Sequence, residues 1–499
     1  MIERVRREET WQQPSVNIYP DPYKIIRIQF PVVEELRDTP RETWPSRDAL
    51  PSTLMILADT FQDAGWHGLA VRMFQEALEF VRLDADRANL RRTLDSLRKS
   101  LVALERYEEA LPVAEEELAL ALELARPGSY DLEIANEAWY SMTDLLGKLG
   151  RHEDAARVAG EAVEYARGQK KVKNGPPEGY PLAHKLSEYA DRLTAIGEYE
   201  RAIEAAAEAA AFWQHRDTFA TGYEIFNDLS LLQQRLGRIE EARTSHAAAV
   251  ETLRRPAEKT RDWTYLSNLA GALTNHGIRL HDLGFDEDSV PVHQESVERY
   301  RALAAATERP ETIRKMELKL GLALCALSCR FHDLGRLDEC FAASDEAIAL
   351  ATKHDDRDQL AQAWTNRASA LITRRCYAEA AEAAAKGLEL YRDAEDKAMA
   401  RNTFALASAH LGQHDVALEA SLRSVAEYRE WCAGDPYEYA YLLADALTDH
   451  ALIRVLRAER AEAEAAIAES LVLHQELVAR NPGRYQRELD RAWGVAAQI

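Results

Sequence analysis

Cys325, Cys329 and His332 are the residues of this chain whose types and spacing come nearest to a metal site. They lie four and three residues apart, which places all three on one face of a helix. Two thiolates and an imidazole could hold Zn²⁺ if a fourth ligand came from elsewhere. The simpler interpretation is a set of small packing residues, because free cysteine packs like a small hydrophobic side chain. We therefore expect no metal and no cofactor.

Enzyme motifs are missing from the rest of the chain. The sequence contains no P-loop, no G-x-S-x-G element, no H-E-x-x-H and no C-x-x-C. His246, His276, His293 and His450 fall at positions where helices would pack on each other, which favours packed or edge histidines over catalytic bases. The sequence thus predicts a protein that is not an enzyme.

The charge balance and the distribution of apolar residues argue against two classes of partner. The 499 residues carry a net charge of −22, and a polyanion repels phosphate backbones, so we expect no nucleic acid partner. No stretch reaches 18 apolar residues, and Met1–Gln13 lacks the apolar core of a signal peptide, so we expect neither a membrane partner nor export. The five cysteines are unevenly spaced and do not form a disulfide framework. These features favour a cytoplasmic protein.

A short spacing recurs along most of the chain. In the clearest copies a glycine is followed five residues later by alanine, as in Gly150 and Ala155. Serine or cysteine replaces the alanine in two copies, and three copies lack the glycine. The ten small residues after the turn, called anchors below, are Ala70, Ala110, Ala155, Ala202, Ala242, Ser289, Cys340, Ala380, Ala417 and Ala463. They lie 37 to 51 residues apart, which is room for two helices of about three to four turns and their connections.

Apolar residues around each anchor follow a helical period. The stripe before Gly197 consists of Leu186, Tyr189, Ala190, Leu193 and Ile196. Such a stripe forms one side of a helix, and the glycine can adopt a positive φ that ends the helix. The small residues then lie where two helices cross, since only a small side chain lets the helix axes come close there. The pattern predicts a series of helical hairpins.

These hairpins resemble the tetratricopeptide repeat (TPR) family over about Pro51 to Leu477. They are longer than the usual repeat of about 34 residues, and are similar to the extended repeats of kinesin light chains and of bacterial, especially actinobacterial, signalling proteins. The resemblance implies an all-α fold, a right-handed superhelical solenoid of about ten hairpins with terminal caps. Residues 1–50 are then an N-terminal extension or cap rich in proline and aromatic residues, 51–477 the repeat array, and 478–499 a C-terminal capping helix.

Three regions fall outside the regular array. Tyr23–Phe30 is expected to be a short strand or an extended segment, and residues 1–50 to dock either over the first repeat or into a partner. Gly168–Pro181 is a basic loop in an acidic protein. Arg484–Ala497 is expected to be a lone helix that covers the apolar face of the last hairpin.

The resemblance also indicates which residues would meet a partner. In the family the first helix of each hairpin lines a concave groove, and side chains about six and ten residues before the turn point into it. The groove residues expected on this basis are Asp59, Lys99, Tyr140, Asp144, Asp191, Asn227, Asn275, His281, Asn366, Ser369 and Asn402. Asparagine can both donate to and accept from a peptide backbone, and carboxylates favour lysine or arginine on the ligand.

Together these features predict a non-catalytic TPR scaffold or adaptor. It would bind a protein or peptide, of basic or mixed charge, in its concave groove and regulate or assemble that partner. The alternative is a ligand-sensing regulatory module that acts on a separate NTPase, protease or transcription factor.

Overall fold

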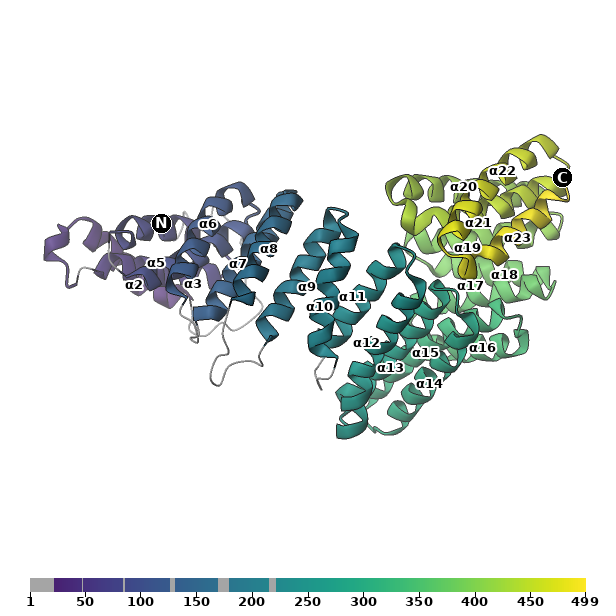
Figure 1. The fold of residues 1–499 in the computed structure, drawn as a ribbon, viewed down its shortest axis with the longest axis horizontal. Helices are drawn as coiled ribbons and strands as arrows, with labels where there is room; N and C mark the ends of the chain where they lie inside the picture. The colour runs from purple at the N-terminus through teal and green to yellow at the C-terminus, as the bar shows by residue number, and fades with distance from the viewer. Residues whose placement is uncertain (1–21, 47, 84–85, 126–130, 169–178, 215–220) are drawn as a thin grey trace. The chain divides into compact units, whose positions relative to one another are not determined.

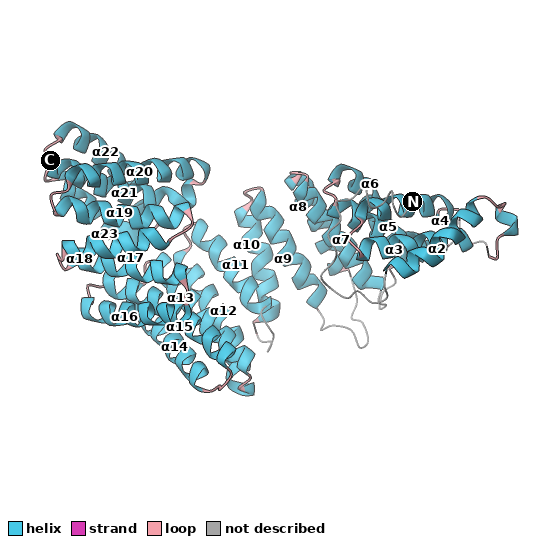
Figure 2. Cartoon of the chain, turned by 180° about the vertical axis from the view of Figure 1, so that it is seen from behind, coloured by secondary structure: helices cyan, strands magenta, loops and turns pink. Residues whose placement is uncertain are grey.

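The structure is a computed structural model, which describes residues 22–46, 48–83, 86–125, 131–168, 179–214 and 221–499. Every regular element in these ranges is a helix (Figure 2). The chain divides into two compact units, Met1–Phe212 and Trp213–Ile499, called unit 1 and unit 2 below. The core of the basic loop, 169–178, lies outside the described residues.

The described part of unit 1 begins with a helix and a short 3₁₀ turn, η1 (Arg41–Thr43), and continues as helical hairpins (Figure 1). Its α-helices are α2 (Pro22–Arg37), α3 (Ala49–Asp63), α4 (His67–Val81), α5 (Arg87–Ala103), α6 (Tyr107–Leu124), α7 (Asp131–Lys148), α8 (His152–Arg167), α9 (Tyr180–Ala195) and α10 (Tyr199–Trp213), which ends at the unit boundary. From α3 onward, odd-numbered helices are the first and even-numbered helices the second of each hairpin.

Unit 2 continues the same arrangement. Its helices are α11 (Thr221–Arg235), α12 (Ile239–Thr260), α13 (Trp263–Asp282), α14 (Asp286–Ala305), α15 (Pro310–Asp333), α16 (Leu337–His354), α17 (Arg357–Thr373), α18 (Tyr377–Leu390), α19 (Ala394–His410), α20 (His414–Gly434), α21 (Pro436–Leu456), α22 (Arg460–Arg480) and α23 (Pro482–Ala496). Each helix contacts the next along the chain, and from α13 each odd-numbered helix also contacts the next odd-numbered one. The fold is therefore an all-α solenoid of helical hairpins, as the sequence predicted.

The anchors are buried without exception. All ten small residues have 0% of their surface exposed, including the serine and cysteine copies Ser289 and Cys340. This complete burial agrees with the constraint on residue size inferred from the sequence, because buried positions in close-packed interiors leave little space for a larger side chain.

The hairpin turns adopt the left-handed conformation expected of the turn glycines. Gly150, for example, has a φ of 69°, and its neighbour Arg151 donates its backbone N–H to the carbonyl of Leu146, as in a helix-ending Schellman turn. The three hairpins without a turn glycine keep this geometry with other residues. Their left-handed positions are Glu105, Arg375 and Ala458, with φ of 58°, 63° and 60°.

The prediction of a strand or extended segment at Tyr23–Phe30 is wrong, because these residues belong to α2. The buried residues Ile26, Val33 and Leu36 lie seven and three residues apart, which is a helical spacing. β-branched residues such as its isoleucines are common in strands, but here the segment packs against α3 as a helix. Trp44 secures the turn that follows, since its indole N–H lies 3.0 Å from the carbonyl of Leu36.

The last helix covers the end of unit 2. Ala492 and Val495 of α23 form a buried apolar cluster with Ala451, Ala466 and Ile467 of α21 and α22. Pro482 stands in the first turn of α23, where its missing N–H costs no hydrogen bond. This helix is the C-terminal helix expected from the sequence.

Candidate functional site

The first two residues of the expected groove row lie on α3 and α5 of unit 1. Asp59 lies 3.2 Å from the guanidinium of Arg92, and burial raises the pKa of its carboxyl group. The ammonium of Lys99 lies 2.7 Å from Asp95, one helical turn away on α5, and its side chain is 55% exposed. Both residues stand at a surface that a partner could reach.

The next part of the row, on α7 and α9, carries an exposed aromatic ring among acids. Tyr140 is 56% exposed, and Glu137 on the same face of α7 is also exposed. Asp144, one turn further along, is only partly buried and lies 2.8 Å from Lys148. Asp191 on α9 is exposed. In unit 1 the row is therefore a solvent-accessible, predominantly acidic surface with one large aromatic side chain.

In unit 2 the two row residues on α17 form hydrogen bonds within the fold. The amide of Asn366 donates to the carbonyl of Cys325 at 3.1 Å and lies 3.4 Å from the hydroxyl of Ser328, so it ties α17 to α15. The hydroxyl of Ser369 donates to the carbonyl of Thr365 at 3.3 Å. These polar groups already have partners within the fold.

Asn402 and Asn275 are engaged in the same way. The amide of Asn402 on α19 donates a hydrogen bond to Asp449 on α21 at 2.6 Å. The carboxylate of Asp449 also accepts a hydrogen bond from the guanidinium of Arg491 on α23 at 2.7 Å. The amide of Asn275 on α13 lies 3.2 Å from the hydroxyl of Tyr223 on α11. The odd-numbered helices of unit 2 are thus joined to one another by the amides that the sequence assigned to a ligand.

Asn227 belongs to a histidine pair. Its side-chain oxygen lies 3.2 Å from Nε2 of His246, whose Nδ1 lies 2.9 Å from Nδ1 of His276. The two imidazoles stack 5.0 Å apart. Burial lowers the pKa of His246 to about 3 and of His276 to about 4, so both are neutral at pH 7 and can share one hydrogen between them. The pair supports packing between α12 and α13.

His281 does not share the exposure of the unit 1 row. Its side chain is 10% exposed at the end of α13, and its Nδ1 lies 2.5 Å from Asp286 at the start of α14. It spans the turn between the two helices, so little of its imidazole is left for a ligand.

The Cys325, Cys329 and His332 set lies on α15, where burial raises the pKa of both thiols, that of Cys325 to about 12. The imidazole of His332 is hydrogen-bonded to Thr373 at 2.9 Å. Neutral thiols are poor metal ligands. Among the described residues, no group of three or more potential metal-binding side chains comes together.

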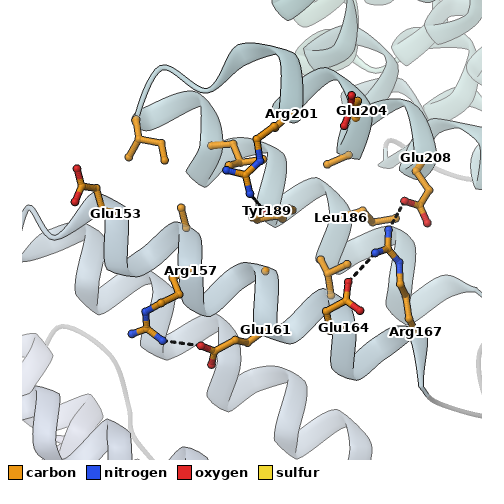
Figure 3. A pocket seen from close by; sticks show the side chains of 16 residues that line it. Glu153, Arg157, Glu161, Glu164, Arg167, Leu186, Tyr189, Arg201, Glu204 and Glu208 are labelled. Carbon is orange, nitrogen blue, oxygen red and sulfur yellow. Dashed lines mark hydrogen bonds and ion pairs between the residues drawn. The ribbon is translucent and has the colours of Figure 1, made fainter.

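A second surface, which the sequence did not indicate, is a hollow of about 840 Å³ between α8 and α10 of unit 1 (Figure 3). The helix α9 forms its floor with Leu186, Tyr189 and Leu193, and the two second helices form its walls. Gly160 on α8 makes room for the floor, because a Cβ there would stand 3.3 Å from the ring of Tyr189. A glycine inside an otherwise alanine-rich helix was the signal in the sequence for this close approach.

Charged side chains line the walls of this hollow. Arg167 at the end of α8 lies 2.7 Å from Glu164 on the same helix and 2.6 Å from Glu208 on α10, so it bridges the two walls (Figure 3). Arg201 donates to the hydroxyl of Tyr189 at 2.6 Å. The lining holds five glutamates and three arginines, so its net charge is negative. An amphipathic or cationic ligand matches this lining.

No protein-family model matches the sequence, and no curated protein matches it. Solved structures do match. The apo form of RapI has a TM-score of 0.50 at 11% identity, over 79% of this chain and 99% of its own. A Rap protein complexed with competence and sporulation factor gives a TM-score of 0.41 at 13% identity, over 78% of this chain and 98% of its own.

The TPR-like repeats of a putative kinesin light chain from Podospora anserina match with a TM-score of 0.33 at 15% identity, over 44% of this chain and 96% of theirs. At these identities the likeness concerns the fold alone. In the described part of the chain, no helix is both long and apolar enough to cross a bilayer.

Proposed function

We propose that this chain, whose helical hairpins resemble tetratricopeptide repeats, is a non-catalytic scaffold that holds a protein or peptide on the odd-numbered helices of unit 1. The observation that carries this proposal is Tyr140, a large aromatic side chain that is 56% exposed on α7. Tyrosine gives a large contact area with a polar end, and it is enriched among the residues that dominate binding energy in interfaces.

The acids beside Tyr140 determine which partner the surface favours. Glu137 and Asp144 lie on the same side of α7, and Asp191 lies on the next odd-numbered helix. Carboxylates form their strongest hydrogen bonds with arginine and lysine, and the net charge of −22 attracts cations from a distance. The proposed partner is therefore a basic segment, extended along the odd-numbered helices.

Unit 1 is favoured over unit 2 because its part of the row carries a large exposed aromatic side chain. In unit 2, Asn366 and Asn402 bond to neighbouring helices at 3.1 and 2.6 Å. A ligand that recruited these amides would have to break bonds within the fold, and each bond is worth about 1 kcal/mol. Tyr140 of unit 1, by contrast, is 56% exposed.

The test uses a phage-displayed library of random twelve-residue peptides on the full chain. Peptides that bind are expected to be rich in arginine and lysine. They should lose at least tenfold in affinity on a Tyr140→Ala, Asp144→Asn double variant, as expected for removal of a central contact. The matched control is Trp493→Ala, which removes another half-exposed aromatic, in unit 2. Basic peptides that bind the double variant and the control equally well would refute the site.

The hollow between α8 and α10 favours a second candidate function, a ligand-sensing module that acts on a separate NTPase, protease or transcription factor. Its volume of about 840 Å³ is in the range of small-molecule sites. A thermal-shift screen of cationic metabolites on the wild type, compared with a Glu153→Arg, Glu204→Arg variant, tests it. A ligand of the hollow stabilises only the wild type and a Glu430→Arg control. If every hit also stabilises the double variant, the hollow is not the sensor.

A further inference from the structure

The C-terminal helix of unit 2 touches helices that lie far back along the chain. The side-chain amide of Asn481, which caps α23, donates to the backbone carbonyl of Asp282 at the end of α13, 199 residues away, at 3.3 Å. Arg487 of α23 donates to the carbonyl of Asp333 at the end of α15, 154 residues away, at 2.6 Å. The last helix of unit 2, drawn in yellow, therefore contacts the ends of the earlier helices α13 and α15 of the same unit (Figure 1).

A glycine allows the backbones to meet at this point. Gly284, in the turn after α13, has a φ of 90°, and a Cβ there would stand 2.6 Å from the carbonyl carbon of Gly483 and 2.7 Å from the nitrogen of Arg484. Such a distance is not tolerated between a side chain and a backbone. Any residue other than glycine at 284 would have to push α23 away.

A second contact between helices far apart in the chain, α11 and α21, lies beside the first. The guanidinium of Arg235, at the end of α11, lies 4.8 Å from the ring centre of Tyr437 at the start of α21. Gly237 faces the carbonyl of Arg480, which a Cβ at 237 would approach to 3.6 Å. We call the contact between the ends of α11, α13 and α15 and the starts of α21 and α23 the clasp.

Charges of opposite sign gather on the two sides of the clasp. The guanidinium of Arg487 also lies 3.6 Å from the carboxylate of Asp333. That carboxylate lies 3.1 Å from Arg330, which in turn lies 3.7 Å from Asp286. Arg487 is 53% exposed, so water and salt ions reach this network.

The contacts described across the clasp differ from those between neighbouring helices of unit 2. Buried apolar clusters join α23 to α21 and α22, and others join α13 to α15 and α17. The cluster that joins α13 to α15 and α17 and the cluster that joins α23 to α21 and α22 have no residue in common. Neighbouring helices thus stack through apolar burial, whereas the contacts described across the clasp are hydrogen bonds, an ion pair and a cation–π contact.

We propose that the clasp is a reversible latch: unit 2 opens between α23 and the ends of α13 and α15 without unfolding its hairpins. Opening exposes the carboxylates of Asp282, Asp286 and Asp333 and separates Arg487 from Asp333. Higher ionic strength favours the open form, because salt screens the partly exposed charges. The proposal concerns unit 2 and does not depend on the function proposed for unit 1.

Hydrogen exchange of the full chain, read by mass spectrometry, tests the latch. In Gly284→Ala the amides of residues 484–488 are expected to exchange at least tenfold faster than in the wild type. The matched control is Gly335→Ala, the same turn position with a φ of 71° but no atom within 4 Å of the added Cβ. The control carries the same local strain without the clash, so exchange in α23 should stay at the wild-type rate.

Arg487→Ser provides a second, charge-only variant in case Gly284→Ala does not fold. It is expected to speed exchange at 484–488 and to remove most of the salt dependence of that exchange between 0.05 and about 0.5 M NaCl, a range over which the screening length shortens severalfold. Amides in the middle of α22 should keep wild-type protection, which distinguishes opening from unfolding. Unchanged exchange in α23 in the variants that fold, or equal loss of protection in α22, would overturn the proposal.

Discussion

Ala458, in the turn between α21 and α22, tests the reasoning about the hairpin turns most directly. It holds the left-handed position that glycine holds in seven other hairpins, with a φ of 60°. Its side chain is exposed, and the turn bonds run through the backbone, from the N–H of Glu459 to the carbonyl of Arg454 at 3.0 Å. Ala458→Gly therefore removes only one methyl group and no contact.

The expected gain follows from two opposing terms. A residue with a Cβ loses about 1–2 kcal/mol in the left-handed region. Glycine gives back part of this, about 0.4–1 kcal/mol, because it has more conformational freedom in the unfolded chain. We expect Ala458→Gly to raise the free energy of unfolding by about 0.5–1 kcal/mol. No packing term enters, since the methyl group is exposed.

Urea denaturation followed by circular dichroism measures the effect on unit 2, with hydrogen exchange of α21 and α22 as a local readout, because two units need not unfold in one step. The reverse change, Gly412→Ala, is the matched control. Its φ is 77° and no atom lies within 4 Å of the added Cβ, so it should lose a similar amount. A neutral or destabilising Ala458→Gly beside a destabilising Gly412→Ala would show that the strain argument fails.

Three further predictions concern buried groups, each checked by urea or thermal unfolding. Glu117 is 4% exposed and lies 2.7 Å from Arg98, so Arg98→Met leaves its carboxylate buried without a partner. This should lower the free energy of unfolding of unit 1 by about 3 kcal/mol or more, and adding Glu117→Leu in the same chain should restore most of it. Burial lowers the pKa of His293 from 6.5 to about 4. The stability that the neutral imidazole gives the folded state is therefore complete above pH 6.5 and declines as pH falls toward 4, because the unfolded chain takes up the proton first; by pH 5 the free energy of unfolding falls by about 2 kcal/mol. His293→Gln should reduce this fall. Gly277→Ala would place a Cβ 2.4 Å from that imidazole and should cost about 1–3 kcal/mol, whereas Gly494→Ala, with open space around it, should gain up to about 1 kcal/mol.

The fold was predictable because its determinants are local. A hairpin needs a left-handed turn and a small residue where its two helices cross, and both requirements repeat at a fixed spacing. The prediction extended to hairpins without the glycine, such as the one at Ala110, because the anchor alone marks the crossing. It failed at α2, where a strand or extended segment was expected and the residues form a helix that packs against α3.

The candidate site was only partly predictable. The position of Tyr140 relative to its turn indicated an exposed side chain, and it is exposed. The same rule could not tell that Asn402 would meet Asp449, 47 residues later, because that depends on how far one hairpin rotates against the next. The hollow over Tyr189 escaped detection for a similar reason, since its walls come from two hairpins whose separation no single segment determines.

The amino-acid sequence thus specified the hairpins, since the residues that form each one lie within about 50 positions and interact through helix geometry. The tertiary structure decided which faces remain open. Asn481 meets Asp282 across 199 residues only after the small rotations of many stacked hairpins have added up. Such a sum depends on every interface between them, and no local pattern of residues encodes it.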